Sequence, residues 1–228
     1  MSDKRRTRSY PDPFVVEPLA DHKYSIVLLH GRGSNGEHFG IELLDSRMTL
    51  GSALDVEKSQ ASTTLRQHFQ NAKFVFPTAT KRRAKWYNRA TINQWFDSVP
   101  IDEQDNLAAS MTKEQEEWQL GGPRESRAFI KSILKAEIEL VGASNVVIGG
   151  LSQGCAMSLR VLLSLHDEES ETPLPIGAFV GMRGWLPYAD AIVRVLNPSQ
   201  TSKDGSAEDL DEESDDGLFA ASHDDVEF

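Results

Sequence analysis

Residues 145–159, NVVIGGLSQGCAMSL, constrain the fold of this chain more than any other stretch. A β-branched apolar run, the sequence Gly-Leu-Ser-Gln-Gly and a run of small and apolar residues predict a buried strand, a tight turn and a helix. Such a turn exposes the serine and leaves the first helical N–H groups unpaired, which is what a weak hydroxyl nucleophile requires. Gly150 and Gly154 fit because a side chain at either position would collide with the neighbouring strand or helix. We therefore predict Ser152 as a catalytic nucleophile; the competing interpretation is a helix N-cap.

A second motif, His30-Gly31-Arg32-Gly33, follows the apolar run YSIVLLH. A loop in that place supplies the other oxyanion donor in enzymes with this strand–turn–helix arrangement. The backbone N–H groups of Arg32 and Gln153 are the predicted oxyanion hole, and the Arg32 side chain is expected to be incidental.

Strand-like and helix-like segments alternate along the chain, which predicts a mostly parallel sheet with helices on both faces. The predicted strands are residues 24–30, 73–77, 145–150 and 176–182. The predicted helices are residues 123–141, 152–165 and 187–196, with a helix-compatible pattern over 36–70.

The net charge of −11 is concentrated at one end. Residues 197–228 hold eleven acidic residues and one lysine, so residues 1–196 carry 24 acids against 23 bases. We expect an N-terminal arm over residues 1–20, an α/β domain over 21–196, and a disordered acidic tail over 197–228. The nearly neutral body predicts no nucleic-acid partner.

Cys155 is the only cysteine in the sequence, so no internal disulfide can form. We expect a soluble protein of the cytosol, and also of the nucleus, without metal, cofactor or transmembrane segment. The sequence does not predict an oligomeric state.

Five ordered motifs, HGRGSNGEHFG, FPTATKRR, NQWFD, GLSQGCAMSL and GAFVGMRGWLP, resemble the acyl-protein thioesterase, lysophospholipase and carboxylesterase family of α/β-hydrolases, in its fungal version. The resemblance implies hydrolysis of esters or thioesters, with S-palmitoyl cysteine or lysophospholipid as substrates. It implies that Ser152 is the nucleophile and that His30 braces the oxyanion loop. Trp95 and Trp185 then lie near the acyl site, or are core aromatics beneath it.

The resemblance also leads us to expect an aspartate and a Gly-His after the GWLP segment, and the sequence has neither. His166 lies fourteen residues after the nucleophile, roughly 21 Å along the predicted helix at about 1.5 Å per residue. At that distance it cannot act as the general base for Ser152. His223 stands in the acidic tail, and it could act as the general base only if the tail ordered against the site. We therefore expect an α/β-hydrolase whose last strands are missing, as the N-terminal part of a longer enzyme would be.

The sequence leaves three alternative hypotheses for the function of this chain. The first is a serine esterase or thioesterase acting on acylated proteins, lysophospholipids or small esters. The second is a catalytically impaired fragment or pseudoenzyme that binds acyl chains or protein partners without turnover. The third is an interaction protein that uses the acidic tail.

Overall fold

The protein is described here by a computed structural model covering residues 9–48, 62–85, 87–98, 122–165, 175–187 and 189–197. The chain separates into two compact units, Met1–Pro187 and Tyr188–Phe228. The described part of the second unit consists of helix α6 (Ala189–Leu196) and the residue after it. The expected acidic tail lies, apart from its first residue, outside the described residues.

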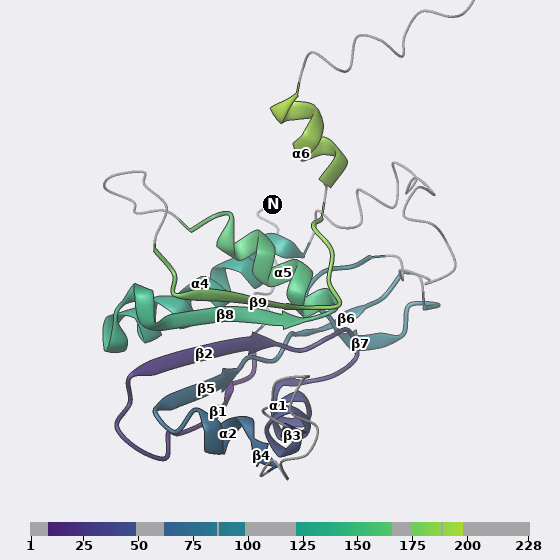
Figure 1. Cartoon of the computed structure of the whole chain (residues 1–228). Helices are drawn as coiled ribbons and strands as arrows, with labels where there is room; N and C mark the ends of the chain where they lie inside the picture. Colours follow the sequence, from purple (N-terminus) through teal and green to yellow (C-terminus); the bar gives the residue numbers. More distant parts are fainter. Residues whose placement is uncertain are drawn as a thin grey trace, which may run out of the picture. The chain divides into compact units, whose positions relative to one another are not determined.

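The first unit contains the sheet and the remaining helices (Figure 1). Its strands are β1 (Phe14–Val16), β2 (Tyr24–Leu29), β3 (Arg47–Met48), β4 (Thr63–Thr64), β5 (Ala72–Phe76), β6 (Lys81–Arg83), β7 (Thr91–Asn93), β8 (Val146–Leu151) and β9 (Ala178–Met182). Its helices are α1 (Gly36–Asp45), α2 (Leu65–His68), α4 (Pro123–Val141) and α5 (Gln153–Leu162), with a 3₁₀ turn η1 (Ala143–Asn145).

Five strands form the main sheet in the order β1-β5-β2-β8-β9. The four strands β5, β2, β8 and β9 are parallel, and β1 adds antiparallel to the outer side of β5. Strand β9 stands at the other edge, where Val180 is 41% exposed. The four predicted strands are thus the four parallel strands of this sheet, and the prediction of a mostly parallel sheet is confirmed.

Alternate residues of β2 divide the core between the two faces of the sheet, as the two-residue period of a strand requires. Val27 and Leu29 belong to the cluster that includes Ile130 of α4 and Ala156 of α5. On the other face, Leu28 belongs to the cluster formed with α1 and β5. Helices therefore cover both faces, α4 and α5 on one and α1 on the other (Figure 1).

The pattern over residues 36–70 proved only partly helical. Helix α1 ends at Asp45, and the next residues pair as β3 with β4. The adjacent β-branched residues Thr63 and Thr64 favour extended backbone over helix. Thr64 then caps the short helix α2 by accepting a hydrogen bond from the Gln67 N–H.

Part of the N-terminal segment expected as an arm over the surface joins the sheet, because β1 lies within its described residues. Residues of β1 pair in register with β5, so that Phe14 lies opposite Phe76. Tyr10 stacks on Phe129 of α4 with ring centroids 4.1 Å apart. Because the Ser126 hydroxyl donates to the Trp95 carbonyl oxygen at 2.6 Å, it accepts from the Tyr10 hydroxyl at 3.0 Å.

A buried polar cluster joins α4 to the amino ends of two strands. Glu137 of α4 accepts hydrogen bonds of 2.7 Å from the Ser25 hydroxyl of β2 and from the Lys73 ammonium of β5. His22 contacts the same Ser25 oxygen at 3.0 Å. Since Glu137 is 5% exposed, these donors replace the water that its carboxylate loses on folding.

Replacing Glu137 by alanine leaves the Lys73 ammonium without its partner, and we expect the free energy of unfolding to fall by about 3 kcal/mol. Urea denaturation measures this change. The matched control is Glu139→Ala on the exposed side of the same helix, which we expect to change stability by less than about 0.5 kcal/mol. Equal effects of the two substitutions would contradict a stabilising role for the cluster.

Candidate active site

Ser152 lies at the junction of β8 and α5, in the turn predicted from the sequence. Its backbone has φ 53° and ψ −117°, a conformation that non-glycine residues rarely adopt. The side chain makes no capping hydrogen bond to the helix, so the N-cap interpretation does not hold. The residue is half-buried, and its N–H donates to the Met182 carbonyl oxygen at 2.8 Å. Strain of this kind is typical of residues held for function.

The two glycines of the turn allow α5 to begin against the end of β2. A Cβ at Gly154 would lie 2.2 Å from the Leu29 carbonyl oxygen. A Cβ at Gly150 would lie 2.7 Å from the same oxygen and 2.6 Å from the Gly154 carbonyl carbon. These positions exclude any side chain because the colliding atoms belong to the backbone and cannot rotate away.

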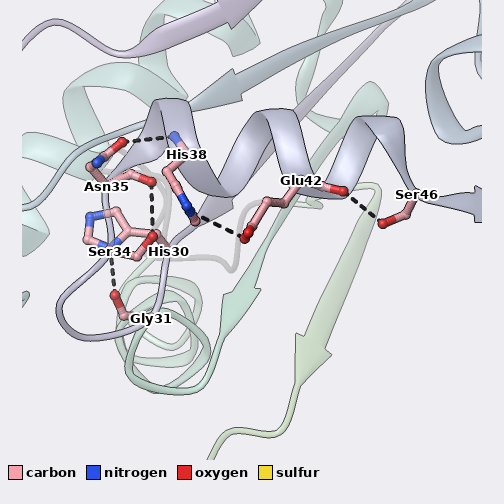
Figure 2. Close-up of polar contacts among 7 residues, drawn as sticks. All are labelled: His30, Gly31, Ser34, Asn35, His38, Glu42 and Ser46. Atoms are coloured by element: carbon pink, nitrogen blue, oxygen red, sulfur yellow. Dashed lines mark hydrogen bonds and ion pairs between the residues drawn. The ribbon is translucent and has the colours of Figure 1, made fainter.

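The loop after β2 passes directly beside Ser152. A Cβ built on Gly31 would lie 3.7 Å from the Ser152 Cβ, an ordinary contact distance. The loop turns at Gly33, whose φ is 84°, and then enters α1, where the Asn35 side chain accepts from the His38 N–H at 2.8 Å (Figure 2). The structure thus brings the two predicted oxyanion segments together, with Gln153 in the first turn of α5.

His30 ties this loop to the segment after β5. Its Nε2 accepts the Ala79 N–H at 3.0 Å, so its Nδ1 carries the ring proton and donates it to the Gly31 carbonyl oxygen at 2.6 Å (Figure 2). Burial lowers the pKa of His30 from 6.5 to about 4, against the opposing effect of the Gly31 hydrogen bond. The imidazole is therefore neutral, with both nitrogens occupied.

The Arg32 side chain, which we expected to be incidental, makes two contacts with other side chains. Its guanidinium lies 5.7 Å from the centre of the Tyr87 ring and donates a hydrogen bond to the Ser98 hydroxyl. Ser98 also accepts from the side chain of Gln153 at 3.3 Å. Sequence reasoning missed Ser98, because a single serine after the NQWFD motif gives no signal of its own.

The two tryptophans occupy different environments. Trp95 is fully buried, and its indole N–H donates to the His30 carbonyl oxygen at 2.9 Å. It therefore packs as a core residue beneath the loop. Trp185 is half-buried and meets Phe96 edge to face, with ring centroids 6.2 Å apart.

The remaining candidates are His38, Cys155 and two histidines outside the described residues. His38 of α1 pairs with Glu42 at 3.3 Å on the surface. His166 and His223 are not among the described residues. Cys155 is 4% exposed. Burial raises the pKa of its thiol, although a hydrogen bond with the Met182 backbone acts in the opposite direction. The raised pKa favours the unreactive protonated form.

Comparison with known protein families agrees with the fold and with the turn around Ser152. The sequence profile of the Phospholipase/Carboxylesterase family matches residues 50–202, more than half of the chain. The chain belongs to this family. The family fold is the α/β-hydrolase fold, so the fold and the family expected from the sequence are both confirmed.

Proteins similar to this chain include two fungal proteins named acyl-protein thioesterase 1. The protein from Yarrowia lipolytica is 28% identical over 82% of this chain and 68% of its own length. The protein from Schizosaccharomyces pombe is 23% identical over 80% of this chain and 65% of its own length. This chain therefore spans about two thirds of the length of these relatives.

A solved structure shows the same fold. The crystal structure of acyl-protein thioesterase 2 from Zea mays matches with a TM-score of 0.51 and 24% sequence identity. The match covers 83% of this chain and 69% of the maize protein.

The close approach at Gly154 gives a stability prediction for this family member. Gly154→Ala forces the new methyl group against two carbonyl oxygens, and we expect a loss of about 3 kcal/mol or more in the free energy of unfolding. Gly31→Ala is the control, because a Cβ there meets its neighbours at 3.6 Å or beyond. Thermal and urea denaturation compare the two variants, and equal stability would contradict the backbone collision.

The lowered pKa of His30 gives a pH prediction. The pKa of His30 is 6.5 in the unfolded chain and about 4 in the folded chain. The contribution of the neutral imidazole to folding stability is therefore fully present above pH 6.5 and is lost as the pH falls toward 4. Between about pH 7.5 and pH 5 this residue should remove about 2 kcal/mol of stability. Urea denaturation of wild type and His30→Gln at both pH values isolates the effect. An identical pH dependence in both proteins would contradict it.

Proposed function

We propose that Ser152 is the nucleophile of a hydrolase that acts on carboxylic esters and thioesters. The observation that carries the proposal is the backbone of Ser152, held in a strained turn with its hydroxyl free of any helix-capping role and beside the loop of Gly31. Membership of the Phospholipase/Carboxylesterase family supports the same chemistry.

The proposed reaction has two stages. The Ser152 hydroxyl oxygen bonds to the substrate carbonyl carbon, and its proton passes to a general base. The negative oxygen that develops accepts hydrogen bonds from the backbone N–H groups of Arg32 and Gln153. The bond to the leaving alcohol or thiol then breaks, with return of the proton to the leaving group. In the second stage, water attacks the acyl-serine and releases the carboxylic acid.

Neither His30 nor His22 is placed to act as the general base. His30 has both ring nitrogens occupied by Gly31 and Ala79. His22 contacts Ser25 at the amino end of β2, whereas Ser152 follows the carboxyl end of β8. The described ranges contain no histidine after Ser152.

The substrate class is proposed from the relatives. Two fungal proteins similar to this chain are named acyl-protein thioesterase 1, and we propose acylated proteins as substrates, with lysophospholipids and small esters as further members of the class. We propose the cytosol or nucleus as the site of action, because a chain with a single cysteine needs no oxidising compartment to form an internal disulfide. Among the described helices, none combines the length and apolarity needed to span a membrane.

Labelling with a fluorophosphonate probe tests the nucleophile. The activated serine displaces fluoride from phosphorus and keeps the probe, so wild type should be labelled once, at Ser152, as peptide mass spectrometry would show. Ser152→Ala should lose the label, and Ser132→Ala on the exposed side of α4 should retain it. Equal labelling of wild type and Ser152→Ala would remove the assignment.

A further inference from the structure

One hydroxyl group connects the side chains of the two residues whose backbones are the proposed oxyanion donors. The Ser98 oxygen accepts one hydrogen bond from the Arg32 guanidinium and another from the Gln153 side-chain amide. A serine oxygen has two lone pairs and can accept both bonds at once. Ser98 is 2% exposed and Gln153 is 1% exposed, so water does not compete freely for either group.

The segment that carries Ser98 is itself attached to both sides of the site. On the side of α5, the Gln153 side chain accepts the Trp95 backbone N–H at 3.0 Å and donates to the Phe96 carbonyl oxygen at 2.8 Å. On the loop side, the Asn93 carbonyl oxygen accepts the Gly33 N–H at 2.8 Å, and the Asn93 side chain donates to the Ser34 carbonyl oxygen at 2.9 Å. Residues 93–98 therefore bridge the loop after β2 and the start of α5.

The bridge matters because the two donors come from different parts of the chain. Arg32 follows β2 and Gln153 follows β8, so no local turn sets the distance between their N–H groups. An oxyanion hole stabilises the developing charge only when both donors are in position before the reaction. Displacement of such a group by about 1 Å can cost up to about a hundredfold in rate.

We propose that Ser98 is a positioning residue that sets the separation of the Arg32 and Gln153 backbone N–H groups. It acts through the two side chains that it joins. This inference rests on the proposed function, because it assigns a role within the same oxyanion hole.

The kinetic test uses the full chain and a fluorophosphonate probe over a range of concentrations. Ser98→Ala removes the shared acceptor, and Arg32→Met removes one donor side chain while keeping the backbone N–H. We expect each to lower the maximal labelling rate about tenfold or more, with the half-saturating probe concentration unchanged. Ser98→Thr, which keeps the hydroxyl, should recover most of the rate, and Ser132→Ala should match wild type.

The double variant tests the connection between the residues. If both act through one bridge, Ser98→Ala combined with Arg32→Met should be no slower than the slower single variant. Multiplicative losses, or a maximal rate in Ser98→Ala equal to that of wild type, would overturn the proposal. Reduced labelling that is explained entirely by a smaller folded fraction, measured by circular dichroism, would overturn it as well.

A second readout does not depend on chemistry. In amide NMR spectra, Ser98→Ala should shift the backbone resonances of Arg32 and Gln153 and leave those of the α4 residues around Ser132 unchanged. Unchanged resonances of both donors would overturn the inference even if Ser152 reacts. If wild type takes no label at Ser152, the proposed function fails, and the NMR comparison still decides whether Ser98 positions the two amides.

Discussion

The contact between the first turn of α5 and the last residue of β2 determines the geometry of the rest of the site. Gly154 packs so closely on the Leu29 carbonyl that no side chain fits between the helix and the strand. This packing forces the chain to turn sharply at Ser152, which explains the left-handed φ of that residue. It also places the start of the helix next to the loop that follows β2. One steric condition therefore produces the strained serine and the neighbouring donor segment together.

Around this contact, buried polar groups hold loops that the hydrophobic core alone would leave adjustable. Hydrophobic packing is non-directional, whereas each hydrogen bond fixes a distance and an angle. His30 links the loop after β2 to Ala79, and Gln153 links the first turn of α5 to Trp95. Both side chains are fully or almost fully buried, where an unmade hydrogen bond is costly, so these links resist rearrangement.

The sequence predicted the parts of the molecule that repeat a simple local pattern. Continuous apolar runs identified the four parallel strands, and the spacing of glycines around Ser152 identified the turn, because both patterns follow from backbone sterics within a few residues. Strand β1 was missed because only three residues pair, and their partner β5 lies far along the chain. The position of Ser98 was missed for a similar reason: its contacts with Arg32 and Gln153 join segments that local patterns cannot relate.

The hydrogen-bond chain from Tyr10 through Ser126 to Trp95 has a practical consequence for handling this protein. Trp95 in turn supports the His30 carbonyl, so the N-terminal segment is only a few bonds removed from the loop beside Ser152. A polypeptide that starts after Tyr10 would lack the first hydrogen bond of this chain. Truncation of the N-terminus should therefore stop short of Tyr10.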